Sequence, residues 1–133
     1  KSSLLQKNCP MSCRIREEMM TLSEIIGKFG FTVYAPPADG RVKVENGYAS
    51  DLLSDVIANA GKDDIWVTMQ MHVNIIAVAA LKDVAAIVIV SHHKPADETI
   101  EIAKQKGVCV LGTGMTAFET CGRLYAAGIR EGG

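Results

Sequence analysis

The apolar positions near the start of the regular pattern have the spacing of a helix. They fall at i, i+3, i+4 and i+7, on one face: Leu22, Ile25, Ile26 and Phe29. Thr21 and Glu24 have the spacing of a capping box, in which each side chain accepts a hydrogen bond from the other residue's backbone N–H. Gly30 is a residue type that commonly ends a helix. The pattern therefore predicts a helix that begins after Thr21 and ends at Gly30.

Further along the chain, strand-like and helix-like segments alternate. Short runs rich in β-branched residues predict strands at 31–35, 41–48, 65–69, 85–90 and 108–111. Helices are predicted after Ser50, from Asn74 to Lys82, from Pro95 and from a second capping box that begins at Thr116. The helix after Ser50 has the following residues on its predicted core face: Leu52, Leu53, Val56, Ile57 and Ala60. This alternation favours a single three-layer α/β domain, with a mixed, mostly parallel sheet flanked by helices.

Residues 1–18 do not share this pattern. They contain four basic and two acidic side chains with little periodicity, and they lack the apolar core of a signal peptide. We interpret residues 1–18 as a poorly ordered leader or vector-derived segment. Residues 19–133 then form the domain, for which Met19 and Met20 are a natural start.

Composition and charge limit the classes of partner. Apolar residues make up 48% of the chain and charged residues 22%, which is typical of a globular protein. Lys and Arg number 14 against 15 Asp and Glu, so no basic excess favours binding to a nucleic-acid backbone. The longest apolar run, 75–81, is far shorter than the roughly 20 residues of a membrane span. With only four cysteines and no signal peptide, we expect a cytoplasmic protein that binds neither nucleic acid nor membrane.

The patterns of known metal, cofactor and catalytic sites do not match this chain. Cys9, Cys13, Cys109 and Cys121 have no zinc or iron–sulfur spacing, and the adjacent His92 and His93 are poorly placed to bind one ion. The sequence contains no G-x-x-x-x-G-K-[ST] phosphate loop. Residues 112–117 match G-x-G-x-x-A, but only sixteen residues follow, too few for a dinucleotide-binding unit. We therefore expect no metal, no cofactor and no catalytic residues.

Polar residues follow three of the predicted strands. Because the carboxyl ends of parallel strands meet at one edge of a sheet, we predict that these residues line a pocket for a polar or singly anionic small molecule. Alternatively, these polar residues are ordinary loop and cap residues that bind no ligand. The predicted ligand-binding residues at the strand ends are Thr68, Gln70, His72, Ser91, His92 and Thr113. Ser50 and Asp51, at a nearby predicted helix start, are expected to border the same pocket.

Residues 46–55, N-G-Y-A-S-D-L-L-S-D, resemble the G-G-Y-x-S-D-L-L-S-D segment of DRTGG domains. Residues 65–70, His72, Asn74, residues 111–113, Phe118 and Glu119 are also similar to that family, and the resemblance covers about residues 21–129. It implies a fold like that of the N-terminal domain of HPr kinase/phosphorylase, without the kinase activity of that protein's separate domain. It also implies a non-catalytic regulatory domain that works as a homodimer and senses a small molecule, with nucleotides as one candidate class.

The sequence is also consistent with two other functions. DRTGG domains also occur beside CBS domains and as free-standing proteins near iron-hydrogenase genes. The resemblance is therefore compatible with an accessory role in iron-hydrogenase maturation or redox chemistry. It is also compatible with a dimerisation scaffold that binds no ligand.

Overall fold

Six strands form one mixed sheet in the computed structural model, which describes residues 19–132. The strand order is β1-β5-β4-β3-β2-β6, in which β1 runs antiparallel to β5 and all other neighbours are parallel. The predicted leader, with Cys9 and Cys13, lies outside the described residues. The strands are β1 (Thr32–Ala35), β2 (Asn46–Ala49), β3 (Ile65–Thr68), β4 (Ala86–Ile89), β5 (Val110–Gly112) and β6 (Arg130–Glu131).

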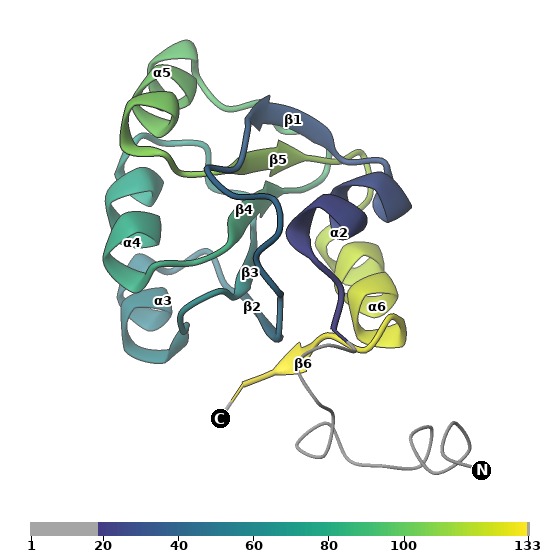
Figure 1. Ribbon diagram of the computed structural model, residues 1–133. Helices are drawn as coiled ribbons and strands as arrows, with labels where there is room; N and C mark the ends of the chain where they lie inside the picture. The colour runs from purple at the N-terminus through teal and green to yellow at the C-terminus, as the bar shows by residue number, and fades with distance from the viewer. Residues whose placement is uncertain (1–18, 133) are drawn as a thin grey trace, which may run out of the picture.

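Five helices of the described residues flank this sheet and make it the middle of three layers (Figure 1). On one face lie α3 (Leu53–Asn59), α4 (Asn74–Lys82) and α5 (Asp97–Lys106). On the other lie α2 (Leu22–Phe29) and α6 (Ala117–Ala126). The predicted three-layer α/β fold with a mostly parallel sheet is therefore confirmed. Within the described residues, no helix is both long and apolar enough to cross a membrane.

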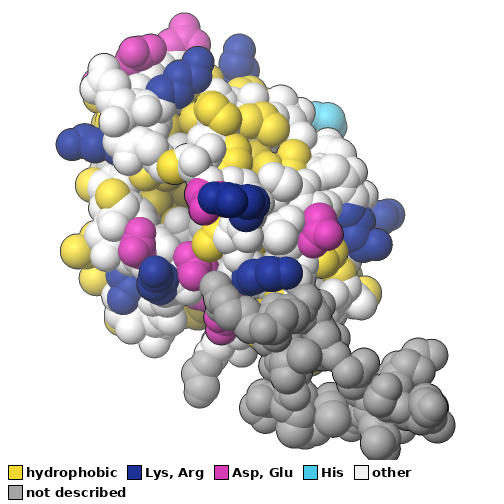
Figure 2. Space-filling model, in the orientation of Figure 1, with side chains coloured by type: hydrophobic (Ala, Val, Ile, Leu, Met, Phe, Trp, Pro, Cys, Tyr) yellow, Lys and Arg dark blue, Asp and Glu magenta, His cyan; other side chains and the backbone are white. Residues whose placement is uncertain are grey.

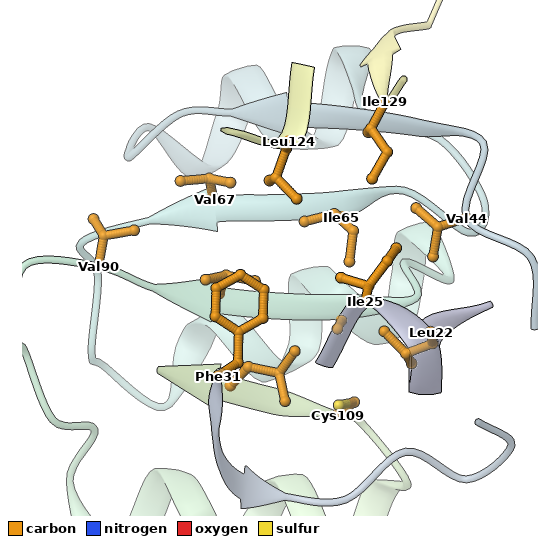
Figure 3. Close-up of a cluster of buried hydrophobic side chains, with 13 residues drawn as sticks. Leu22, Ile25, Phe31, Val44, Ile65, Val67, Val90, Cys109, Leu124 and Ile129 are labelled. Carbon is orange, nitrogen blue, oxygen red and sulfur yellow. The ribbon is translucent and has the colours of Figure 1, made fainter. Parts of the chain in front are cut away.

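Each face of the sheet has its own apolar core, because alternate strand residues point to opposite faces. In β3, Ile65 and Val67 join the core beneath α2 and α6, whereas Trp66 joins the core beneath α3 and α4. Figure 3 shows part of the first core, with Leu124 of α6 and the neighbouring Ile129 beside Val67 and Ile65. The same alternation indicates, for each residue at the end of a strand, whether it points to the face of α2 and α6 or to the face of α3, α4 and α5.

The local signals at the helix ends are mostly confirmed. Thr21 Oγ1 accepts a hydrogen bond from the Glu24 N–H at 3.1 Å, and Glu24 Oε1 accepts one from the Thr21 N–H at 2.8 Å. Thr116 caps α6 in the same way, accepting from the Glu119 N–H at 3.2 Å. The carboxylate of Glu119 instead forms an ion pair with Arg123 at 2.7 Å. The second predicted capping box is therefore only half formed.

Two predictions near β2 are wrong. In place of a strand over 41–48, the structure has an isolated bridge between Lys43 and Thr21, followed by β2 from Asn46. The next helix does not begin after Ser50, because Leu52 is its extended N-cap residue. Leu52 is 65% exposed and Ile57 41% exposed, so neither is a core residue, whereas Leu53 is partly buried and packs against the core. Of the predicted core face, Val56 and Ala60 are buried.

Candidate functional site

The predicted residues at the ends of β2 and β3 form one hydrogen-bonded network. Asp51 Oδ1 accepts hydrogen bonds from Thr68 Oγ1 and from the Met69 N–H, both at 2.7 Å. Gln70 donates from Nε2 to the Asp51 carbonyl at 3.0 Å and from its backbone N–H to Thr68 Oγ1 at 3.1 Å. The structure therefore brings Asp51, Thr68 and Gln70 together. The network ties the loop after β2 to the end of β3.

Ser50 lies next to this network and is held mainly by backbone contacts. Its N–H donates to the Val67 carbonyl at 3.2 Å, and its carbonyl accepts from Trp66 Nε1 at 2.9 Å. Ser50 Oγ accepts from the Leu52 N–H at 3.1 Å, one turn before the helix begins. Ser50 thus anchors the loop against β3, although it does not cap α3 as predicted.

The segment that resembles DRTGG domains is a folded unit around this loop. The Tyr48 hydroxyl lies 2.9 Å from both carboxylate oxygens of Asp55 and donates to this carboxylate. This hydrogen bond, together with desolvation, raises the pKa of Tyr48. Asn59 Nδ2 also donates to Asp55 Oδ1, at 2.8 Å. Within this unit, the side chains of β2 and α3 hold each other in place.

The turn after β4 has an unusual backbone. Ser91 and His92 both have φ of 61°, and the His93 N–H donates to the Val90 carbonyl at 3.2 Å. Two successive positive φ values with this hydrogen bond are typical of a type I′ turn, which normally uses Asn and Gly. The Ser91 N–H donates to the Met115 carbonyl at 2.7 Å, and the His92 N–H donates to the Thr113 carbonyl at 3.0 Å. The structure thus brings Ser91, His92 and Thr113 together.

The imidazole of His92 rests against Gly114. A Cβ atom at position 114 would lie 2.3 Å from His92 Cε1, closer than real Cβ contacts come. Thr113 Oγ1 accepts from the Met115 N–H at 3.2 Å, which shapes the same loop. Gly114, in the G-T-G-M-T-A segment, therefore leaves space for the His92 ring. This role is typical of a glycine in a tight turn and does not need a dinucleotide-binding motif.

The network around Asp51 and the turn around His92 lie at the ends of neighbouring strands, along one edge of the sheet. The Val90 N–H donates to the Thr68 carbonyl at 3.1 Å, and the Thr113 N–H donates to the Ile89 carbonyl at 3.0 Å. His72 is exposed, and within residues 19–132 its imidazole makes no hydrogen bond to either cluster. We define the strand-end site as the residues that share this edge and its contacts: Ser50, Asp51, Thr68, Gln70, Ser91, His92 and Thr113.

Burial changes the properties of both cysteines of the described residues. Burial raises the pKa of Cys109 to about 12 and also raises the pKa of Cys121. A thiol that keeps its proton is a poor nucleophile and a poor metal ligand. Residues 19–132 contain no group of three or more His, Cys, Asp or Glu side chains arranged to hold a metal ion. Figure 2 shows basic and acidic side chains interspersed over the visible face.

A pocket of about 350 Å³ lies elsewhere, between α6 and the last residues of β2. The sequence did not predict it, because β6 is only two residues long and has no periodic pattern. Arg130 of β6 places its guanidinium 3.8 Å from the centroid of the Tyr125 ring. We call this cavity the α6 pocket; it is lined by Gly47, Tyr48, Ala49, Val67, Cys121, Leu124, Tyr125, Ile129, Arg130 and Glu131.

Comparisons with known proteins bear on the fold. No protein-family model and no curated protein matches the sequence. Among solved structures, the chain is similar to the CBS and DRTGG domains of the regulatory region of Clostridium perfringens pyrophosphatase, complexed with the activator diadenosine tetraphosphate. The match has a TM-score of 0.69 and 17% sequence identity, and it covers 98% of this chain. The chain has a DRTGG-like fold. It spans 57% of the length of the pyrophosphatase chain.

Proposed function

We propose that this DRTGG-like domain is a non-catalytic regulatory domain that binds a small molecule at the strand-end site. The nucleotide class is favoured, because the structure that shares its fold is a regulatory region complexed with a nucleotide activator. In parallel sheets, the carboxyl ends of the strands are where ligands usually bind. In this proposal the domain works as a homodimer in the cytoplasm.

The observation that carries the proposal is the turn that holds His92. A left-handed backbone costs about 1–2 kcal/mol at each residue other than glycine. Such conformations persist where the surroundings enforce them, and they are concentrated at binding sites. Here two successive residues adopt this conformation, at 61° each, and they place an exposed imidazole against Gly114. Regular strand-to-helix connections do not need this strain, so a role in recognition explains it.

The surroundings of His92 favour a polar or anionic ligand. Thr116 caps the start of α6, where backbone N–H groups and the helix dipole favour negative charge. At the end of the neighbouring strand β3, Thr68 and Gln70 add neutral polar groups. This mixture of neutral donors with a histidine suits a phosphate or a nucleotide more than a bare cation.

A thermal-shift screen followed by calorimetric titration tests the proposal. AMP, ATP and diadenosine tetraphosphate are the probes, since a molecule that binds only the folded state raises the unfolding midpoint. His92→Ala and Thr113→Ala should each weaken binding about tenfold, the effect of losing one good hydrogen bond. His72→Ala is the matched histidine control and should keep the parent's affinity. If none of the three probes raises the midpoint, the nucleotide class is wrong. If both site variants fold and bind like the parent, the strand-end site is not the binding site.

A further inference from the structure

The α6 pocket exists because small residues line the strand face that α6 covers. Gly47 and Ala49 point to this face, while Tyr48 between them points to the other face and donates to Asp55. Opposite them, α6 contributes Cys121, Leu124 and Tyr125 to the wall. The volume of about 350 Å³ falls at the lower end of the range for small-molecule sites. The space therefore fits one small, compact molecule.

Most of the wall is apolar. Val67, Leu124 and Ile129 are buried and belong to the core beneath α6, and Figure 3 shows them close together. Gly47 lies close to this wall, since a Cβ there would be 3.3 Å from Ile129 Cγ2. Tyr125 is 58% exposed and adds an aromatic ring to the wall. A wall of this kind binds the apolar, flat part of a ligand.

One cationic group stands at the mouth of the pocket. Arg130 lies over the Tyr125 ring and donates from its guanidinium to the Tyr125 carbonyl. Among the described residues no ion pair with Arg130 is found, and its guanidinium has further N–H groups besides the one that donates to Tyr125. The next strand residue, Glu131, also lines the pocket, and its charge helps to raise the pKa of Tyr48. The pocket therefore combines an apolar interior with one cationic and one anionic side chain, of which Arg130 is the one that can bind an anion.

We propose that the α6 pocket is a second binding site, for a small aromatic molecule that carries one carboxylate or phosphate group. The ring lies between Ala49, Val67 and Leu124, and Arg130 binds the anionic group. Arg130 is suited to this role because its planar guanidinium binds both carboxylates and phosphates through paired hydrogen bonds. This site is separate from the strand-end site, since it lies on the α6 face, whereas Thr68 points to the face of α3 and α4.

Titration calorimetry with three naphthalene probes tests the proposal. The probes are 2-naphthyl phosphate, 2-naphthoate and the uncharged 2-naphthylmethanol. The parent should bind at least one of the two anions about tenfold or more tightly than the alcohol, because a charged hydrogen bond is gained. Comparison of the two anions shows which group the pocket prefers. If no probe binds at millimolar concentration, or if the alcohol binds as tightly as both anions, the proposal is wrong.

Three variants locate the site. Arg130→Met should remove the preference for the anions and leave binding of the alcohol unchanged. Ala49→Leu should fill the space and abolish binding of all three probes, and Ala49 is exposed, so this change does not enlarge a core residue. Arg123→Met, on the exposed surface of α6, is the matched control and should behave like the parent. Unchanged binding in folded Arg130→Met or Ala49→Leu protein would overturn the assignment. His92→Ala should not affect these probes, so failure here is distinguishable from failure of the strand-end site.

Discussion

Replacing Asp51 by alanine should destabilise the domain, although this side chain is exposed. One carboxylate oxygen accepts hydrogen bonds from the Thr68 hydroxyl and from the Met69 N–H, both at 2.7 Å. Hydrogen bonds to a charged group contribute about 1.5–3 kcal/mol each in mutational series, and solvent around an exposed carboxylate reduces this value. Thr68 is buried, so its hydroxyl also loses the acceptor for its proton. We expect a loss of about 2 kcal/mol for Asp51→Ala.

A double-mutant cycle separates this contact from general effects of each substitution. Thr68→Val keeps the shape of the side chain and removes the hydroxyl that donates to Asp51, and it should cost about 1–2 kcal/mol. Because both variants remove the same hydrogen bond, the double variant should lose about 1 kcal/mol less than the sum of the two. The free energies come from urea unfolding, with an unchanged dependence on urea as the check for a common unfolded state.

The control for this cycle is Asp39→Ala. Asp39 also accepts a backbone N–H, from Arg41 at 3.0 Å, but both residues of this contact are exposed. Its replacement should leave the urea midpoint almost unchanged. The reasoning is refuted if Asp51→Ala and Thr68→Val both fold and their effects add to within about 0.3 kcal/mol, the value expected of independent sites.

Two other predictions concern buried groups. Val56→Ala should cost about 1–3 kcal/mol, because Val56 is fully buried, whereas Leu52→Ala should change stability by less than about 0.5 kcal/mol. Equal urea midpoints for these two variants would show that the start of α3 is misplaced. Burial raises the pKa of Cys109 from 9.0 to about 12, so the unfolded chain loses this proton first, and the stabilisation is lost as pH rises from 9 toward 12. In reducing buffer above pH 9, the parent should lose about 1.4 kcal/mol per pH unit more than Cys109→Ala, and parallel pH profiles would contradict this.

The sequence predicts the elements whose signals are local. α2 begins and ends as predicted, because its capping residues and its apolar face are all within ten positions of one another. β3 and β4 were predictable for a similar reason, since a buried central strand needs an unbroken apolar run. The arrangement of the strand-end residues also followed from topology. Parallel strands place Thr68 and Thr113 at one edge whatever the details of the loops are.

Features that depend on distant contacts were not predictable. β6 is a strand only because Arg130 and Glu131 pair with Asn46 and Gly47, which lie in the first half of the described chain. The start of α3 depends on Asp51, whose side chain binds the end of β3 and not the helix. The α6 pocket combines both effects, since it needs β6 beside small residues of β2. A periodic pattern contains no information about such pairings.

The strand order has a consequence for how the chain is synthesised. β1 pairs only with the much later β5, and the outer edge of β2 pairs only with β6, so both edges of the sheet are completed late. The strands β2, β3, β4 and β5 pair with one another in sequence order, so they can assemble in this order while translation continues. Until β5 and α6 leave the ribosome, the inner strands keep open edges and an uncovered apolar face, which are the features that promote aggregation. A pause in translation before position 110 would therefore hold this domain at its most vulnerable stage, and the fold should be completed once β5, α6 and β6 have been synthesised.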